Sequence, residues 1–249
     1  VNTGDVAGKR SYVGGIVGRM DLGYLTACET SSCTITNENG SYTGGIAGLT
    51  GATVLGNFSK CTLSGKKYVG GIVGEAIVSD DTMRLNIQNC YSLTALDINA
   101  KSLAMAGGIA GRFNGATLGI SGIDRCYSAG TISAKSPVSA YAGGIVGFCY
   151  AGQIYAYKNS EATMKNCVGY KEMKLTASKI QYADRSEELL ETFFTAAFLE
   201  TLGFDTETVW QLNDAALPTL RYEATAKNVY RIKEFRYDTE TETVVASLV

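Results

Sequence analysis

The sequence predicts an all-β fold, a right-handed parallel β-helix (β-solenoid) of about five coils with a C-terminal α-helical cap. A seven-residue phrase recurs five times: YVGGIVG at 12–18 and 68–74, YTGGIAG at 42–48, MAGGIAG at 105–111 and YAGGIVG at 141–147. The first glycines of the pairs are 30, 26, 37 and 36 residues apart, a period typical of stacked repeats. The 29 glycines, and the lack of helical apolar spacing within the repeats, exclude an α-solenoid.

The shortest interval, residues 42–67, shows the minimal repeat. It contains three strand-like segments, YTGGIAG, ATVL at 52–55 and CTLS at 61–64, separated by Gly, Ser, Asn or Lys. Three strands in this length match one coil of a parallel β-helix, and the longer intervals then carry insertions in their turns. A β-propeller blade needs about 40–45 residues. The 26-residue repeat is too short for one, so a propeller is excluded. A set of small β-sandwiches remains the competing fold.

The positions that recur in every copy of the phrase indicate a role in packing and not in chemistry. We expect the isoleucines to stack about 4.8 Å apart as an internal ladder formed by Ile16, Ile46, Ile72, Ile109 and Ile145. Paired glycines let a strand bend, or approach the opposite wall where a Cβ would collide. These structural glycines are Gly14, Gly15, Gly44, Gly45, Gly70, Gly71, Gly107, Gly108, Gly143 and Gly144.

The repeats divide the chain into three parts. Residues 1–176 form the repeat solenoid, and residues 177–226 form a helical capping segment. Its amphipathic helix over 184–204 is expected to lie across the open end of the stack. Residues 227–249 are β-favouring and fit either a hairpin or one strand leading into a missing domain. Because the first residues match the middle of a repeat, we expect the chain to be cut from a longer protein.

The cysteines predict a column of buried thiols. Cys33, Cys61, Cys90, Cys126 and Cys167 each open the third segment of a repeat. In-register side chains on parallel strands are about as far apart as the strands, which exceeds the ~3.8 Å Cβ separation of a disulfide. We therefore expect free thiols in this column instead of disulfides.

Composition restricts the possible partners and chemistry. The net charge is −2, so we expect no nucleic-acid partner, and no apolar run is long enough to cross a membrane. The chain has no His, which removes the commonest general base and metal ligand, so we expect no catalytic residue, cofactor or metal site. The carboxylates that an enzyme would need are Asp80 and Asp81 beside Arg84, and the isolated Asp97 and Asp124. We expect these carboxylates to be ordinary residues of solvated turns and not a catalytic cluster.

A tyrosine-rich stretch is the candidate binding site. Tyr150, Tyr155 and Tyr157, together with Tyr127 and Tyr170, have the composition of a stacking platform for sugar rings. Alternatively, they shield the edge of the last coil.

The GGIVG or GGIAG phrase followed by an NCYS-type segment resembles the GLUG motif of bacterial cell-surface proteins. The resemblance covers residues 1 to about 176, and the stretch DTETVWQLNDAALPTLRY at 205–222 resembles the way such arrays end. The motif occurs in outer-surface proteins of Bacteroidetes and in immunoglobulin-A-specific zinc metalloproteases. The catalytic HExxH site of those proteases lies outside the repeats, and no residue of it carries over to a chain without His.

The resemblance implies an exported protein at the cell surface or secreted, with a role in adhesion. We expect a non-catalytic module that binds an extracellular ligand, either a glycan or a matrix or host protein, with anchoring through a region before Val1. The alternative function is a carbohydrate-active β-helix enzyme, either a polysaccharide lyase or a hydrolase. That alternative requires two carboxylates facing each other across a groove.

Overall fold

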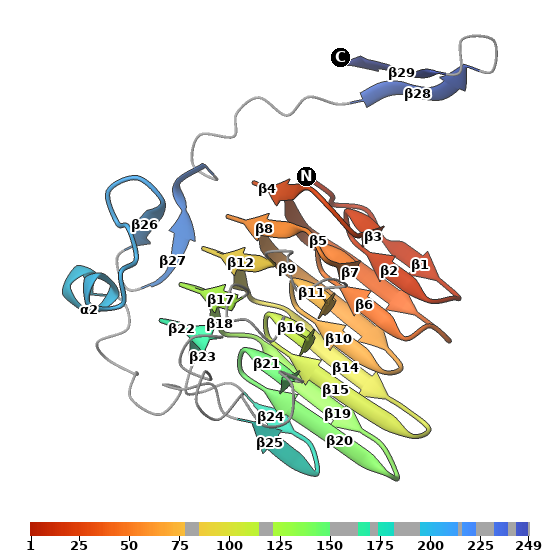
Figure 1. The fold of residues 1–249 in the computed structure, drawn as a ribbon, viewed down its shortest axis with the longest axis horizontal. Coiled ribbons are helices and arrows are strands. Elements are labelled where there is room, and N and C mark those ends of the chain that lie inside the picture. The colour runs from red at the N-terminus through yellow and green to blue at the C-terminus, as the bar shows by residue number, and fades with distance from the viewer. Residues whose placement is uncertain are drawn as a thin grey trace.

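The fold is a parallel β-solenoid, as predicted. The computed structural model describes residues 1–77, 85–114, 122–149, 164–169, 174–181, 195–213, 216–222, 232–238 and 243–248. Strands of successive repeats lie side by side in four parallel sheets (Figure 1). Each winding passes in order through the four sheets, which are numbered 1 to 4 below, and then returns to sheet 1 through a short connecting turn. We call the row of these returning turns the turn edge.

The strands of each sheet follow the repeats. Sheet 1 contains β2 (Tyr12–Gly14), β6 (Tyr42–Gly44), β10 (Tyr68–Gly70), β15 (Leu103–Gly107), β20 (Ser139–Gly143) and β25 (Lys179–Gln181). Sheet 2 contains β3 (Val17–Met20), β7 (Ala47–Thr50), β11 (Val73–Ile77), β16 (Ala110–Asn114) and β21 (Val146–Cys149). Sheet 3 contains β4 (Tyr24–Thr26), β8 (Thr53–Leu55), β12 (Asn86–Gln88), β17 (Gly122–Asp124) and β22 (Met164–Lys165). Sheet 4 contains β1 (Val6–Gly8), β5 (Glu29–Asn37), β9 (Phe58–Gly65), β13 (Tyr91–Ser92), β14 (Ala95–Asn99), β18 (Tyr127–Ser128), β19 (Thr131–Lys135), β23 (Val168–Gly169) and β24 (Leu175–Thr176).

The repeated phrase forms two strands in each winding, where the sequence predicted one. In the second copy, β6 ends at Gly44 and β7 begins at Ala47, so Gly45 and Ile46 make the corner between sheets 1 and 2. Each winding therefore passes through four sheets, whereas the sequence predicts three strands per coil. The double glycine permits the corner because its neighbours leave no room for a Cβ.

The isoleucines of the phrase stack at this corner. Backbone hydrogen bonds connect them from one winding to the next, from Ile46 N to Ile72 O at 2.9 Å and from Ile72 N to Ile109 O at 3.0 Å. Ile46, Ile72, Ile109 and Ile145 have no exposed surface. Ile16, at the corresponding corner of the first winding, is 39% exposed.

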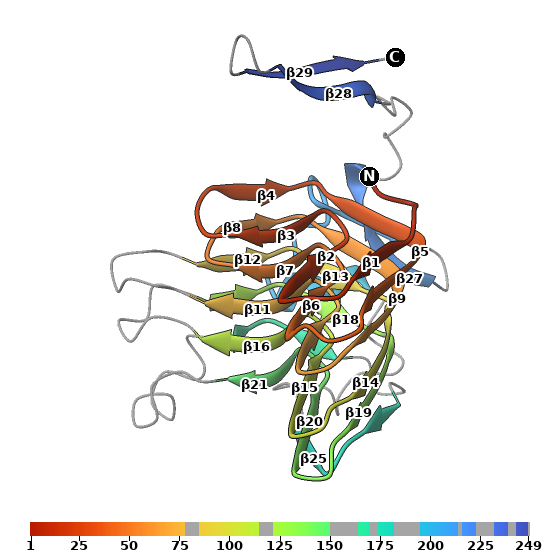
Figure 2. The same ribbon diagram turned by 90° about the vertical axis from the view of Figure 1, so that its right-hand side faces the viewer.

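Two apolar cores run along the solenoid. One lies between sheets 2 and 3 and includes the isoleucine ladder, and the other lies between sheets 1 and 4 around Leu63 and Val69. Figure 2 shows the two lobes that these sheet pairs form. In the waist between the lobes, the second glycine of each of the first four pairs lies against a buried hydroxyl side chain. These pairs are Gly15 with Thr30, Gly45 with Ser59, Gly71 with Ser92, and Gly108 with Ser128.

The thiol column differs from the one predicted. Pairing of Glu29 with Phe58 and of Phe58 with Tyr91 aligns Cys28, Asn57, Cys90, Cys126 and Cys167. In this column the side chain of one winding accepts a backbone N–H of the previous one. Asn57 Oδ1 accepts from Cys28 N at 2.7 Å, and Cys126 Sγ accepts from Cys90 N at 3.4 Å. Burial raises the pKa of the Cys126 thiol, as expected for an unreactive structural cysteine.

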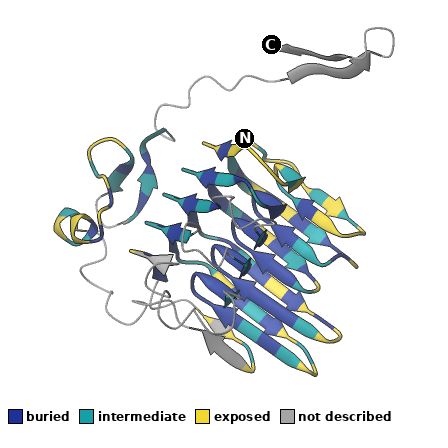
Figure 3. Ribbon diagram, viewed as in Figure 1, coloured by how far each residue is buried: buried dark blue, intermediate teal, exposed yellow. Residues whose placement is uncertain are grey.

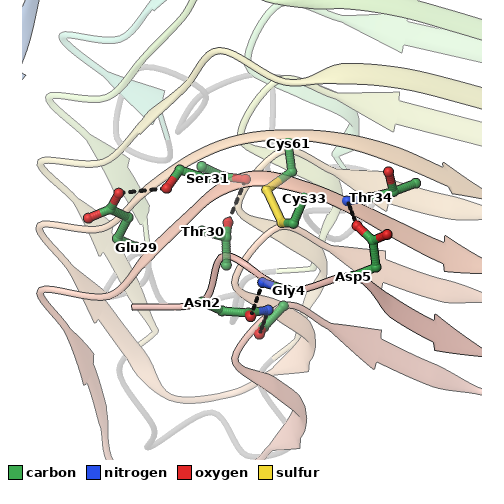
Figure 4. The surroundings of a disulfide bond; sticks show 11 residues. Asn2, Gly4, Asp5, Glu29, Thr30, Ser31, Cys33, Thr34 and Cys61 are labelled. Carbon is green, nitrogen blue, oxygen red and sulfur yellow. Dashed lines mark hydrogen bonds between the residues drawn. A yellow bond between two sulfur atoms is a disulfide. The ribbon is translucent and has the colours of Figure 1, made fainter. Parts of the chain in front are cut away.

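The prediction that Cys33 and Cys61 are free thiols is wrong, because they form a disulfide between adjacent windings (Figure 4). The pairing register shifts between Ser31 and Thr34, so Ser32 and Cys33 together oppose a single residue of β9. Such a bulge breaks the uniform spacing on which the prediction relied. The two Cα atoms are 5.1 Å apart, within the disulfide range.

The described part of the C-terminal segment, residues 195–213 and 216–222, packs against the side of the stack and not across its end. The described part of the predicted helix is α2 (Ala196–Thr201), N-capped by Thr195, and residues 182–194 lie outside the described residues. The antiparallel strands β26 (Trp210–Asn213) and β27 (Ala216–Leu220) follow. Trp210 and Phe204 pack on the stacked rings of Phe58, Tyr91 and Tyr127, which sheet 4 presents outward. A helix sequence shows which of its faces is apolar but not which surface that face covers.

The last two strands, β28 (Ile232–Asp238) and β29 (Thr243–Leu248), form a hairpin. This is one of the two arrangements that the sequence left open.

Candidate ligand-binding site

The predicted aromatic platform is outside the part of the chain that the structure describes. Tyr150, Tyr155 and Tyr157 lie there, as do Asp80, Asp81 and Arg84. Tyr127, the one platform tyrosine that is described, is fully buried, and its hydroxyl donates to the Pro218 carbonyl. It is therefore a packing residue, so of the two roles that the sequence left open for these tyrosines, Tyr127 does not have the sugar-stacking one.

The turn edge carries a row of cations. Lys9 and Arg10 occupy the turn before β2, Lys66 and Lys67 the turn before β10, and Lys101 the turn before β15. Lys135 ends β19 beside the next turn. Glu38 is the one carboxylate within the five turns at 9–11, 38–41, 66–67, 100–102 and 136–138. Figure 3 shows the exposed residues that gather along these turns.

The turn formed by Lys66 and Lys67 is recessed between longer turns. These two residues connect Gly65 to Tyr68, whereas four residues, 38–41, connect the ends of β5 and β6. In the next winding, Ile98 pairs with Gly65 and Met105 pairs with Tyr68, so residues 99–104 span the same step. The short turn follows from the 26-residue interval, the shortest in the sequence.

The recess is a hollow of about 320 Å³. It is lined by three turns and includes Asn39, Ser41, Lys66, Lys67, Lys101 and Ser102. Backbone hydrogen bonds hold the turns in register, from Tyr68 N to Ser41 O and from Met105 N to Lys67 O, both 2.7 Å. The hollow therefore combines ammonium, amide and hydroxyl groups on a hydrogen-bonded frame.

A tyrosine ladder on sheet 1 begins beside the hollow. The rings of Tyr12, Tyr42 and Tyr68 follow one another with centroid separations of 5.0 and 5.3 Å. The Lys67 ammonium lies 4.8 Å from the Tyr68 ring centroid. Because each ring of the ladder covers the next, Tyr42 and Tyr68 offer no free ring face for sugar stacking.

A buried ion pair packs against this ladder. The Glu75 carboxylate, on sheet 2, is 2% exposed and pairs with Arg112 of the next winding. Arg112 also donates to the Tyr68 hydroxyl at 2.9 Å. Burial raises the pKa of Glu75, and the positive charges of Arg112 and Lys67 partly oppose that rise. The cluster connects two sheets and two windings.

The isolated carboxylates do not come together. Asp97 is an exposed residue of sheet 4, whereas Asp124 belongs to sheet 3 and forms an ion pair with Arg125 at 2.8 Å. Within the described residues, no three His, Cys, Asp or Glu side chains are grouped to hold a metal ion. Nor does the described chain contain a helix with the length and apolarity to cross a bilayer.

Sequence reasoning missed the turn-edge hollow. Two signals for it were present, the shortest interval of the array and the adjacent lysines at its end. Their significance depends on the lengths of the neighbouring turns, which become comparable only once the strand register is known.

Comparison of the chain with protein-family models, with curated proteins and with solved structures gives no match.

Proposed function

We propose that this protein is a non-catalytic repeat module, exported to the cell surface or secreted, that binds an extracellular glycan or matrix protein. The observation that carries the proposal is the hollow around Lys66 and Lys67, where three turns bring polar and cationic side chains together. Surface loops on a rigid scaffold are a common location for binding sites. The four hydrogen-bonded sheets provide that scaffold here.

Two further observations support the location. The Cys33–Cys61 disulfide is typical of proteins that fold in an oxidising compartment. The resemblance of the repeated phrase to GLUG-motif proteins supports both export and adhesion.

The alternative, a carbohydrate-active enzyme, has weaker support. A raised pKa is typical of a general acid, and Glu75 has one. Its carboxylate, however, is enclosed by Arg112 and the tyrosine ladder, so a polysaccharide does not reach it. The Glu75 carboxylate instead connects two windings through its ion pair with Arg112.

A binding screen tests the proposal. The purified protein is applied to immobilised neutral glycans, acidic glycans, collagen and fibronectin, and binding is measured by biolayer interferometry. Saturable binding to at least one of these surfaces, without release of reducing sugar, is the expected result. Failure to bind any of them, or the release of oligosaccharides from a glycan, contradicts the proposal.

A further inference from the structure

The charge distribution of the turn edge indicates the chemistry of its ligand. The chain as a whole is slightly acidic, with a net charge of −2, yet the five turns together with Lys135 carry six cations and one carboxylate. Lys66 and Lys101 are both exposed and lie on adjacent turns around the hollow. A local surplus of positive charge on an acidic protein concentrates anionic ligands at that surface.

The spacing of the cations indicates a polymer. Neighbouring strands are about 4.8 Å apart, so turns two windings apart are separated by about 10 Å. The pair Lys9 and Arg10 is two windings before Lys66 and Lys67, and Lys135 is two windings after them. A single small anion contacts one such group, whereas a chain with repeated charges contacts several at once and gains affinity from each.

The neutral groups of the hollow indicate a sugar. Asn39, Ser41 and Ser102 line it with amide and hydroxyl groups, which suit the hydroxyls of a pyranose ring. Leu103 adds a half-buried apolar surface for the C–H face of such a ring. The volume of about 320 Å³ is at the lower end of the range for small-molecule sites, about 300–1,000 Å³.

From these observations we infer that the turn-edge hollow binds a carboxylate or sulfate group of an acidic polysaccharide. The polysaccharide chain runs along the turn edge, parallel to the solenoid axis, and meets further cations at Lys9, Arg10 and Lys135. This inference rests on the proposed function and specifies its ligand. Binding is electrostatic and weakens with salt, because the Debye length falls from about 10 Å at 0.1 M to about 3 Å at 1 M.

The test compares polymers of different charge. Heparin, polygalacturonate, neutral dextran and duplex DNA are immobilised, and binding is measured at low and high salt. We expect heparin or polygalacturonate to bind, with weaker binding at high salt, and dextran not to bind. Equal binding of dextran, or binding of DNA as tight as that of the polysaccharides, overturns the inference.

Two variants locate the site. Lys66→Gln/Lys101→Gln removes two cations of the hollow, and we expect a loss of affinity of about tenfold, which corresponds to about 1.4 kcal/mol. Lys174→Gln makes the same chemical change at an exposed position on sheet 4 away from the turns, and we expect no loss. A loss that is equal in the two variants, or absent from the first, overturns the inference.

Inserting Gly-Ser between Lys66 and Lys67 separates shape from charge. The insertion keeps every cation but lengthens the recessed turn from two residues to four, the length of the turn at 38–41. We expect binding to fall, with an unchanged circular dichroism spectrum. Unchanged binding shows that charge alone is recognised and overturns the assignment to the hollow.

The outcomes also separate this inference from the proposed function. Binding to a neutral glycan or a matrix protein without binding to an acidic polysaccharide overturns the inference and leaves the proposed function standing. If none of these surfaces is bound, both fail.

Discussion

Gly71 and Ser92 meet in the waist between the two cores, where a Cβ added to Gly71 would lie 2.0 Å from the Ser92 hydroxyl oxygen. The same Cβ would lie 2.1 Å from the backbone oxygen of Gly108 in the next winding. The Gly108 oxygen belongs to the backbone of the stack, so it cannot move aside as the end of a flexible side chain can. The contact therefore explains why the phrase repeats its second glycine in every copy.

Gly71→Ala is expected to destabilise the protein strongly. Overpacking costs about 1–3 kcal/mol, and we expect the upper end because a backbone atom has to move. Gly4→Ala is the matched control, since its Cβ would meet only Asn2 Oδ1 at an ordinary 3.6 Å. Chemical denaturation measures both, and an equal free energy of unfolding for the two variants would falsify the close contact.

Ile72→Asp places a carboxylate in a fully buried position of the isoleucine ladder. We expect a loss of several kcal/mol, roughly 4, because the charge has no partner there. Leu22→Asp removes a side chain of similar size that is 63% exposed, and it should change stability by less than about 0.5 kcal/mol. Similar melting temperatures for the two variants would contradict the assignment of inside and outside.

The disulfide predicts the thiol count. Seven cysteines and one Cys33–Cys61 bond leave five free thiols, which titration of the denatured, unreduced protein should detect. Cys61→Ser should lower the free energy of unfolding by about 3 kcal/mol, because the bond closes a loop of 28 residues. Finding seven free thiols in protein refolded in air would show that the bond does not form.

The buried Glu75 predicts a pH dependence. Its pKa is raised in the folded protein, so the folded state holds this proton more tightly than the unfolded state does. Stability should therefore fall as the pH rises from the ordinary carboxyl pKa through the raised one. Glu75→Gln removes this contribution, and the wild type should lose stability relative to the variant across that interval. A difference between the two melting temperatures that stays constant as the pH rises above the ordinary carboxyl pKa of about 4.3 would contradict the raised pKa of Glu75.

The C-terminal segment is testable through Trp210, the only tryptophan of the chain. Phe204 packs on it with a ring separation of 5.0 Å, and both side chains are buried. Phe204→Ala should loosen the segment by about 3–5 kcal/mol and shift the tryptophan emission to longer wavelength. The β-sheet circular dichroism should remain. Unchanged emission would mean that Trp210 is buried by other contacts.

The repeat phrase was sufficient to predict the solenoid, because a fixed apolar position in each period has to stack. The predicted column places Cys61 level with Cys90, whereas Phe58 pairs with Tyr91, so Asn57 is the residue level with Cys90. The residue that precedes the observed column has a left-handed backbone conformation in all five of these windings. These residues are Ala27, Gly56, Asn89, Arg125 and Asn166. Their conformation comes from the corner between sheets 3 and 4 and is weakly encoded by residue type.

The site was less predictable than the fold. The position of a turn relative to its neighbours depends on the strand register on both sides of it, and a local sequence contains neither. Lys66 and Lys67 alone read as an ordinary solvated turn. The lateral position of Trp210 was missed for a similar reason, since its partners Tyr91 and Tyr127 are more than eighty residues away.

The unequal lengths of the returning turns have an evolutionary consequence. The interior columns keep the windings in register, so residues inserted or deleted in the turn edge leave the stack aligned. A deletion of a few codons in one repeat is enough to open a new recess between its neighbours. An array of this kind can therefore acquire different specificities by changing the length of single loops while its architecture stays the same.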